Sequence, residues 1–467
     1  MRRAWIALCA LGLSACASTG IDRQRSEAND FARTRFDAEL RVLDSDAARR
    51  DALTEVDRLL QQPVSQQDAV RIALAWSPAL QALMADGAQR SAVAAQPARL
   101  PNPVFAFEKM VRSEGGMREV EIGRVISFSL LDLLWLPSRL DVARNTQAGL
   151  RLNASAEVTR SVAAVRQAWV RAVAAEQALA YHGRVLEAAD AGAELARRMQ
   201  AAGNFSRLQR AREQGFYAEA AANLTRARAQ ALSAREALVR QLGLDGERAA
   251  RLRLPERLPD LPATAMAENQ ALQASLDQRL DVRMARHDLD TTARELGLTR
   301  VTSVVDGLHL GLANKSESGK PMQRGFEVEL PLPLFDFGDA RRADAEARYL
   351  AALNRNAQVA VDAGSGVREQ YGLYRASLDL ARHYRDEIVP LAKTVSDETL
   401  LKYNGMLIGV FDLLADARVQ AGTVVAAIDA ERDFWLAEAA LQSALLGQPT
   451  SIPALTTTAA RAAGAAH

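Results

Sequence analysis

The sequence predicts a mostly α-helical chain with a small β part, in which one unit of structure occurs twice. Composition is the first observation. Of 467 residues, 49% are hydrophobic and only 5% aromatic, and a chain rich in Ala and Leu favours long, closely packed helices. The second is helical periodicity that continues for about sixty residues in two places. The third is that Val165–Trp169 resembles Val367–Tyr371, 202 positions later. A long helix that recurs in this way indicates an internal duplication.

The first fifteen residues are typical of a bacterial lipoprotein signal peptide. Two arginines precede the short apolar stretch Trp5–Leu13, and Leu13–Cys16 reads Leu-Ser-Ala-Cys, which resembles a lipobox. The resemblance implies cleavage before Cys16 and acylation of its thiol, with Ala17 favouring the outer membrane. The alternative is an ordinary signal peptide with a chance cysteine. In both cases residues 1–15 take no part in the fold.

The same cleavage settles the cysteine count. Cys9 lies in the segment that is removed, so Cys16 is the only cysteine left in the mature chain. We therefore expect no intramolecular disulfide, and the fold must be stable by packing alone. Residues 16–63, which follow, are charged and Ala-rich with helical patches, and they predict a solvated N-terminal segment.

The first repeat is predicted over residues 64–246. A helix begins after the N-cap Ser65 and continues to about residue 96, with a kink at Pro78. The period then changes to 2, predicting strands at 104–111 and 119–130 around a turn at 112–117. A helix without proline follows at 138–202, spanning roughly 95 Å, and a second helix returns from about residue 205 to 242.

The second repeat is predicted over residues 265–447, after a Pro-rich linker at 247–264. The same order recurs: a helix at 265–298, strands at 303–313 and 325–332 around a turn at 314–323, a long helix at 340–403 and a return helix at 410–446. Gly364 and Gly366 predict a local bend in the long helix, because each glycine weakens a helix. The tail 448–467 has no period and is predicted to be disordered.

Each predicted strand has one apolar and one polar face. Ile122, Ile126 and Phe128 alternate with Glu121 and small residues. In the second repeat, Phe326 and Val328 alternate with Glu327 and Glu329. The strand lengths are close to the roughly 9–11 residues of a membrane-crossing strand. A soluble hairpin with one buried face remains the alternative. No apolar run approaches 20 residues, so we expect no transmembrane helix, and a membrane could be crossed only by strands.

The order of elements, with a glycine near each helical turn and the passage Leu330–Arg341 (Leu-Pro-Leu-Pro-Leu-Phe-Asp-Phe-Gly-Asp-Ala-Arg), resembles the TolC-like outer-membrane channel family. The resemblance covers about residues 64–447. It implies a homotrimer in which four strands per chain complete a 12-strand barrel in outer-membrane lipid, continued by a long α-helical periplasmic barrel. It also implies a periplasmic adaptor protein and an inner-membrane pump as partners.

The resemblance places a periplasmic gate at the helical turns. Tyr403 and Asp412 match the family's constricting Tyr and Asp, while Ala415 stands where a second acidic residue is expected and Asp416 follows it. For Asp412, a plain helix first-turn carboxylate is the alternative. In the first repeat Arg207 is related to Asp412 by position, and a contact between the two is predicted. The turns themselves are predicted at Gly203, Asn204, Gly405 and Gly409.

These features predict the exit duct of a tripartite efflux system, a passive conduit for small molecules or metal ions. Glu121, Glu327 and Glu329 are the candidate lumen-facing residues. Two alternatives stay open: the exit duct of type I protein secretion, and a lipid-anchored periplasmic coiled-coil scaffold. A net charge of +1 gives no reason to expect nucleic acid as a partner. No enzyme, metal or cofactor is predicted, because His182, His287, His309, His383 and His467 are isolated and no phosphate loop or nucleophile elbow occurs.

Overall fold

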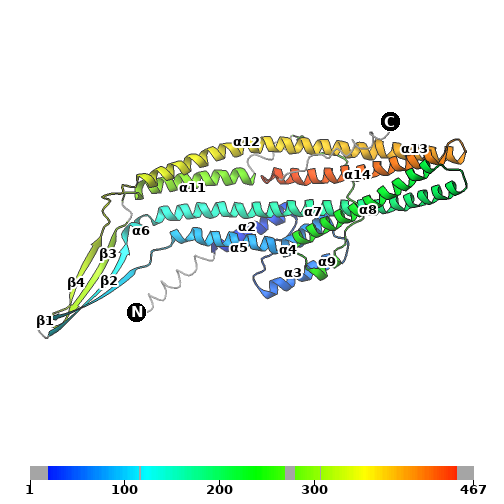
Figure 1. Ribbon diagram of the computed structural model, residues 1–467. Coiled ribbons are helices and arrows are strands. Elements are labelled where there is room, and N and C mark those ends of the chain that lie inside the picture. The colour runs from blue at the N-terminus through cyan, green and yellow to red at the C-terminus, as the bar shows by residue number, and fades with distance from the viewer. Residues whose placement is uncertain (1–18, 115–116, 269–278, 305–306, 450–467) are drawn as a thin grey trace. The chain divides into compact units, whose positions relative to one another are not determined.

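The computed structural model describes residues 19–114, 117–268, 279–304 and 307–449 (Figure 1). Cys9, Cys16 and nearly all of the predicted tail 448–467 lie outside these residues. The helices are α2 (Thr19–Phe36), α3 (Asp46–Leu59), α4 (Gln66–Trp76), α5 (Pro78–Ala95), α6 (Leu130–Leu134), α7 (Leu136–Ala201), α8 (Arg207–Leu242), α9 (Gly246–Arg251), α11 (Leu280–Thr302), α12 (Asp339–His383), α13 (Val389–Asn404) and α14 (Val410–Leu445). Two short helical segments are the 3-10 turn η1 (Gln96–Ala98) and the π-helix η2 (Tyr384–Ile388). The strands are β1 (Val104–Glu114), β2 (Met117–Ser129), β3 (His309–Glu317) and β4 (Gln323–Glu329).

Two compact units share the chain, and neither coincides with a predicted repeat. Among the described residues, the first unit contains Asp86–Ala154 and Val282–Ala360 with the start of α2. The second contains Glu27–Ala85, Ser155–Asp281 and the chain from Val361 onward. The first unit therefore holds all four strands, and the second holds both helical turns. Each unit takes segments from both repeats, as expected if the two repeats are packed alongside each other.

The strands of the first unit form one antiparallel sheet in the order β1-β2-β3-β4 (Figure 1). Within each repeat the strands pair as a hairpin, and β2 pairs with β3 to join the two repeats. The predicted turns were too long. Arg112 pairs with Glu119, and Lys315 pairs with Gln323, because side-chain alternation continues through the polar residues that suggested a turn. Strand β3 begins at His309 rather than 303, and β4 ends at Glu329, two residues before Pro331.

The first long helix is confirmed as α7, a single helix of 66 residues. Its partner α8 begins with a capping box, in which Ser206 accepts from the Gln209 backbone N–H and the Gln209 side chain accepts from the Ser206 N–H. It ends at Gly243, whose φ of 69° is left-handed. A side chain there would collide with Pro78, since a Cβ would lie 2.2 Å from its Cδ. Pro78 opens α5 rather than kinking a continuous helix.

The second long helix is interrupted where the sequence predicted no break. Helix α12 runs through Gly364 and Gly366 without leaving the α-helical hydrogen-bond pattern. The interruption comes at the π-helix η2, and α13 then starts with Pro390 in its first turn. Proline lacks an N–H and its ring displaces the carbonyl four residues earlier, so the preceding turn widens. The irregularity therefore follows from Pro390 and not from the glycines.

Within the predicted helix 265–298, the structure describes a helix from Leu280, and that helix continues to Thr302. Residues 265–267 are not helical, and residues 269–278 lie outside the described chain. Tertiary contacts hold this segment extended. The Tyr371 hydroxyl donates to the Met266 carbonyl at 3.0 Å, and the Met266 N–H donates to the Tyr374 hydroxyl at 3.2 Å. Both backbone groups that a helix would use are thus occupied.

The core of the second unit lies where these tyrosines meet α14. Its buried residues are Leu261, Tyr374, Leu378, Ala381, Ala430, Phe434, Ala437 and Leu441. Phe434 is fully buried, with its ring centroid 5.7 Å from that of Tyr374 and 5.0 Å from that of Trp435. Trp435 in turn donates its indole N–H to the Pro259 carbonyl at 3.1 Å. The Pro-rich linker is therefore part of the packed core.

The N-terminal segment is more ordered than its composition suggested. Helix α2 buries Ala28, Ala32 and Phe36, and α3 buries Val56. Trp169 of α7 donates its indole N–H to the Val64 carbonyl at 2.8 Å. Helix α4 starts at the predicted N-cap, since Ser65 and Asp68 form a capping box. Ala28 and Ala32 recur at helical spacing and bury one face of α2. The charged residues between them had suggested a solvated segment.

Candidate functional site

The two helical turns of the second unit are built differently. Gly203 has a left-handed φ of 81°, and the Asn204 N–H donates to the Met199 carbonyl at 2.9 Å. In the other turn the left-handed residue is Met406, with φ 60°, and Gly405 is not left-handed. Gly409 precedes α14 as its N-cap, with its N–H donated to Asp412 at 3.2 Å. The second turn therefore places a strained side chain where the first has glycine.

The difference gives a matched pair of substitutions. We expect Met406→Gly to stabilise the second turn by about 0.5–1 kcal/mol, because a left-handed side chain costs about 1–2 kcal/mol and the added freedom of the unfolded glycine offsets part of this. Gly203→Ala should destabilise the first turn by about 1 kcal/mol, since no atom lies within 4 Å of a Cβ there and only backbone strain is added. Amide hydrogen exchange at each turn measures both effects. Equal exchange in Gly203→Ala and the native protein would contradict the strain argument.

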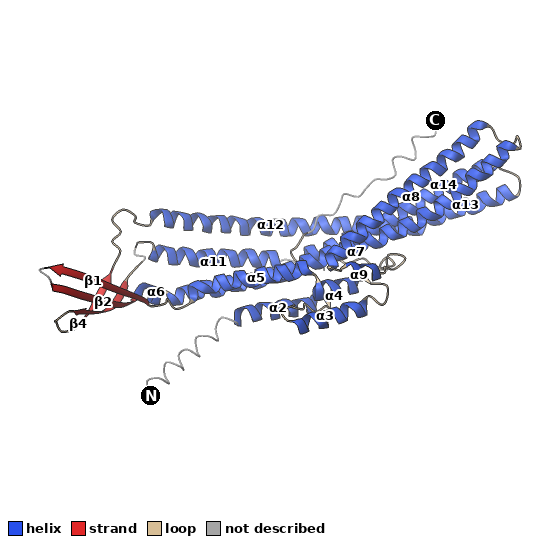
Figure 2. Cartoon of the chain, turned by 60° about the horizontal axis from the view of Figure 1, so that its bottom comes forward, coloured by secondary structure: helices blue, strands red, loops and turns tan. Residues whose placement is uncertain are grey.

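The turns are packed against each other (Figures 1 and 2). Phe205, just after the first turn, stacks on Phe411, just after the second, with ring centroids 4.3 Å apart and planes 25° apart. Ala196, Phe205 and Val410 form a buried cluster, which Met199 and Leu414 extend. This cluster, the tip cluster, joins the helical hairpin of one repeat to that of the other.

Beside the tip cluster an ion pair connects the return helices. Arg418 of α14 lies 2.6 Å from Glu213 of α8, whose side chain is only 4% exposed. The Arg418 guanidinium also lies over the Phe216 ring, 4.5 Å from its centroid. An arginine stacked on an aromatic face and paired with a carboxylate is held in one orientation. We name Arg418, Glu213 and Phe216 the tip lock. No pattern in the sequence predicted it.

The predicted gate residues lie around this structure. Tyr403 is 37% exposed at the end of α13, and its carbonyl accepts from the Met406 N–H. Asp412 is exposed in the first turn of α14. Arg207 is exposed at the start of α8, and no hydrogen bond or ion pair joins it to Asp412, although both residues are described. The link between the hairpins is made by the tip lock instead.

Capping geometry also changes which residues correspond. Gln209 accepts from its N-cap N–H at 2.7 Å, as Asp412 does from Gly409. Gln209, and not Arg207, is therefore the structural counterpart of Asp412. By the same alignment Glu213 corresponds to Asp416. One carboxylate oxygen of Asp416, Oδ2, is shielded from solvent and has no hydrogen-bond partner among the described residues.

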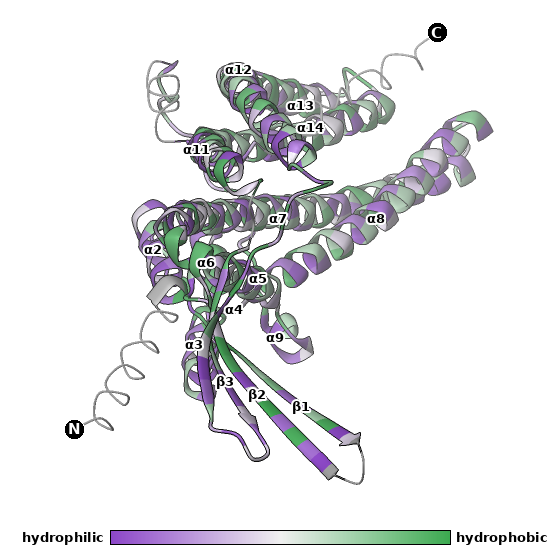
Figure 3. Ribbon diagram, turned by 90° about the vertical axis from the view of Figure 1, so that its left-hand side faces the viewer, coloured by the Kyte–Doolittle hydropathy of each residue, from purple (hydrophilic) through white to green (hydrophobic). Residues whose placement is uncertain are grey.

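In the first unit the register brings the three predicted strand glutamates to one face of the sheet. Glu327 pairs with Gly311, and Glu329 with His309. Glu121 forms an ion pair with Lys315, which lies on the same face. A Cβ on Gly311 would lie 2.8 Å from Val125 Cγ1, so the glycine makes room for the Val125 side chain on this face. The opposite face carries the apolar residues, as the alternation can be followed along β2 in Figure 3.

Further charges are buried between the helices of the second unit. Burial raises the pKa of the Glu438 carboxyl, with Arg166 acting in the opposite direction. Burial also raises the pKa of Asp429 and lowers that of His182. Within the described part of the chain, no group of three or more His, Cys, Asp or Glu is placed to bind a metal ion. These charges serve interhelical contacts.

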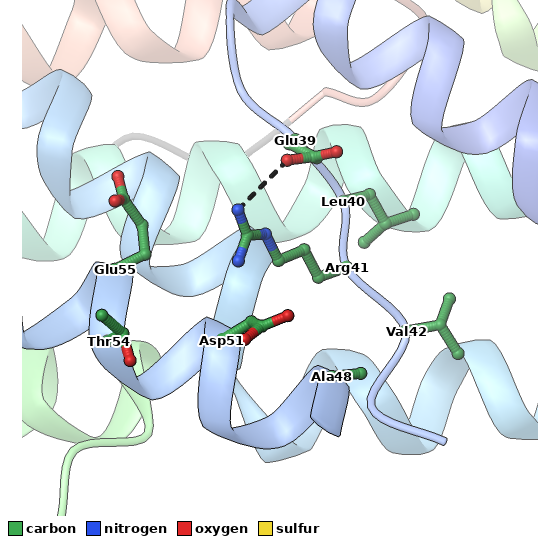
Figure 4. Close-up of a pocket in the computed structure, with 8 residues that line it drawn as sticks. All are labelled: Glu39, Leu40, Arg41, Val42, Ala48, Asp51, Thr54 and Glu55. Carbon is green, nitrogen blue, oxygen red and sulfur yellow. Dashed lines mark hydrogen bonds and ion pairs between the residues drawn. The ribbon is translucent and has the colours of Figure 1, made fainter. Parts of the chain in front are cut away.

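A shallow hollow of about 630 Å³ lies between the loop after α2 and helix α3 (Figure 4). At the edge of the hollow, Arg41 Nη2 lies 3.3 Å from Glu39 Oε2. Asp51 and Glu55 of α3 line the hollow. Glu55 is engaged by Arg58, whose hydrogen bond lowers the pKa of that carboxyl. The hollow is a charged surface depression, and its carboxylate–arginine contacts are structural.

No helix in the described residues combines the length and apolar character that crossing a bilayer requires. No family profile matches the chain, and no curated protein matches it. Solved structures do. A membrane protein of Pseudomonas aeruginosa is 20% identical, with TM-score 0.68 over 87% of this chain and 94% of its own.

Two outer-membrane proteins extend the likeness. The outer membrane protein VceC of Vibrio cholerae is 15% identical, with TM-score 0.66 over 82% of this chain and 96% of its own. The MtrE outer membrane channel of Neisseria gonorrhoeae, solved in its open state, is 20% identical, with TM-score 0.66 over 83% of this chain and 90% of its own. Two hairpin strands per repeat, one long helix and one return helix, all duplicated, make up this architecture. The chain therefore has the fold of the TolC-like outer-membrane channels.

Proposed function

We propose that the protein is the outer-membrane exit duct of a tripartite efflux system. The observation that carries the proposal is the four-stranded sheet, in which the outer edges of β1 and β4 pair with no other strand among the described residues. Open edges leave backbone N–H and C=O groups unpaired, and in lipid each such group costs several kcal/mol. Three copies would join β1 of one chain to β4 of the next and close a 12-strand barrel.

The two faces of the sheet suit such a barrel. Phe105, Phe107 and Phe326 are between 57% and 76% exposed on one face, where they would meet lipid. The opposite face carries Glu121, Glu327 and Glu329, which would line an aqueous lumen and favour cations weakly. We propose that passage is passive: the duct supplies a wall and a gate, and it needs no catalytic group. An inner-membrane pump would supply the energy.

The gate lies at the helical turns of the second unit. Three copies of Asp412 around one axis would narrow the passage and repel one another. The tip lock would hold each protomer's two hairpins together, and opening would separate them. A periplasmic adaptor would engage the turns, where Met406 is 93%, Leu407 77% and Leu208 62% exposed. Acylation of Cys16 would add a lipid anchor.

The charge and the capping role of Asp412 can be separated by substitution. Asp412→Asn keeps an oxygen that accepts from the Gly409 N–H but removes the charge. Asp412→Ala removes both, and loss of that hydrogen bond alone costs about 1 kcal/mol. We expect both variants to raise single-channel conductance in planar bilayers, and only the alanine variant to lower the unfolding temperature. If Asp412→Asn leaves the closed conductance unchanged, Asp412 is a helix cap and not a gate residue.

Reconstitution tests the proposed function as a whole. Full-length protein purified in detergent should migrate as a trimer and form stepwise conductances in planar bilayers. Pro331→Ala, two residues after the end of β4, serves as the control for preparation effects. A monomer that binds membranes only through its lipid and gives no conductance would refute the duct and support the scaffold alternative.

A further inference from the structure

The glutamates of the sheet are confined to one face. Among strand residues whose side chains are described, every glutamate lies on the face of Glu121, namely Glu108, Glu119, Glu121, Glu317, Glu327 and Glu329. The apolar face carries no glutamate. It carries four basic residues, Lys109, Arg118, Arg124 and Arg324, all of them exposed. Basic residues occur on both faces, since Arg112 and Lys315 lie on the glutamate face, but the only charges of the apolar face among these described residues are basic.

The basic residues have a defined place relative to the apolar residues of that face. The register puts Arg124 opposite Asn314, and Asn314 opposite Arg324, in one row across three strands. Lys109 lies one step farther toward the β1–β2 turn, opposite Ile122. On the helix side of this row the face is apolar, with exposures from 36% to 76%. Its residues are Phe105, Ile126, Phe128, Leu310, Leu312, Phe326 and Val328.

Exposed apolar residues continue beyond the strands on the helix side. Leu332, Leu334, Phe335 and Phe337 are between 58% and 97% exposed. The basic row therefore limits the apolar band on the side of the strand turns. Past the row, basic and apolar residues are mixed, with Arg118 beside Val120. Arginine and lysine on the lipid side of a membrane sheet are costly at mid-bilayer and cost little at the interface. With the sheet placed in the membrane as proposed, the row would mark that interface.

We propose that Arg124, Arg324 and Lys109 form a binding surface for phosphate-bearing lipid headgroups of the outer leaflet. Arg124 and Arg324 flank Asn314 with about 10 Å between their strands, and Lys109 lies diagonally across from Arg124. No ion pair with another side chain engages these three residues in the described chain. Guanidinium and ammonium groups bind phosphate oxygens strongly, while the acyl chains of the same lipid lie on the apolar band. The inference rests on the proposed membrane placement of the sheet.

Native mass spectrometry of the full-length protein tests the proposal. Detergent-purified protein is titrated with phosphatidylglycerol and, separately, with phosphatidylcholine of the same acyl chains. We expect the native protein to retain the anionic lipid preferentially. In Lys109→Gln/Arg124→Gln/Arg324→Gln this preference should fall about fivefold for each charge removed. The control Lys315→Gln, on the opposite face, should keep it. Arg324→Gln alone, on the edge strand, gives a milder variant if the triple variant does not fold.

Three results would overturn the proposal: an unchanged preference in the triple variant, an equal loss in Lys315→Gln, or displacement of the lipid by inorganic phosphate at low concentration, which would indicate a simple anion site. Conductance measured on the same preparations separates this proposal from the duct. A triple variant that conducts but has lost lipid preference supports the headgroup surface and leaves the duct intact. A native protein that retains anionic lipid yet never conducts removes the duct alone.

Discussion

Replacing Arg418 with methionine is expected to loosen the two hairpins of each protomer and to raise single-channel conductance. The substitution keeps the length of the aliphatic stem but removes the guanidinium from Glu213, 2.6 Å away, and from the Phe216 ring. Glu213, at 4% exposed, is then a shielded carboxylate without a partner. Such a loss costs up to about 3–5 kcal/mol in a fully buried pair. We expect about 2 kcal/mol here, because Arg418 is 30% exposed and partly screened by solvent.

The expected readouts are local. Amide hydrogen exchange should rise in the first turns of α8 and α14, while the rest of the second unit keeps its protection. The double variant Glu213→Leu/Arg418→Met removes both charges and should recover much of the lost stability, because an apolar pair can replace an ion pair. If the single variant and the double variant are equally destabilised, the unpartnered Glu213 carboxylate is not the cause of the lost stability and the tip lock is incidental.

Phe434→Ala is expected to cost about 4 kcal/mol of unfolding free energy. The ring is fully buried among Tyr374, Leu378 and Leu441, and truncating a buried aromatic residue removes about 3–5 kcal/mol. The ring contacts with Tyr374 and Trp435 add to the loss. Guanidinium unfolding in detergent, followed by circular dichroism, measures it.

Leu232→Ala is the matched truncation, since Leu232 is 62% exposed on α8. It should change stability by less than about 0.5 kcal/mol. If Phe434→Ala also changes the unfolding free energy by less than about 0.5 kcal/mol, the core near the linker does not unfold together with the rest of the unit. Phe434→Ala should also leave conductance unchanged, whereas Arg418→Met should raise it. The two variants therefore distinguish general destabilisation from release of the gate.

Most of the fold could be predicted because its signals are local. Helix α7 carries no proline after its first turn, and the strands alternate so regularly that Glu121 and Ile126 were assigned to opposite faces, as the register shows. Boundaries set by tertiary contacts could not be predicted in this way. The non-helical backbone at residues 265–267, where the sequence predicted helix, is bound by two tyrosine hydroxyls that lie about 105 residues away in the chain.

The candidate site was predicted less completely. The turns were located by their glycines, but only the backbone shows that Met406 takes the left-handed position. Pro390 could have predicted the interruption at η2. The long helical pattern on both sides of it instead predicted one continuous helix. The pairing of Arg418 with Glu213 could not be predicted from local sequence. Many acidic residues lie on other helices, and nothing near Arg418 in the sequence indicates which of them it contacts. Alignment from the N-caps, rather than at one fixed offset, would have paired Gln209 with Asp412.

The pairing of β2 with β3 has a consequence for the history of the chain. In an ancestor with a single repeat, each hairpin would have found its neighbour on another identical molecule, and every turn would have been the same. Once the two copies were fused through the linker, the neighbour of β2 was always β3 of the same polypeptide. Mutations in one half then no longer had to suit the other. The two turns now differ, with Gly203 in one and Met406 in the other at the left-handed position. Glu213 of one repeat pairs with Arg418 of the other, a contact between two residues that no longer need to be the same in both repeats.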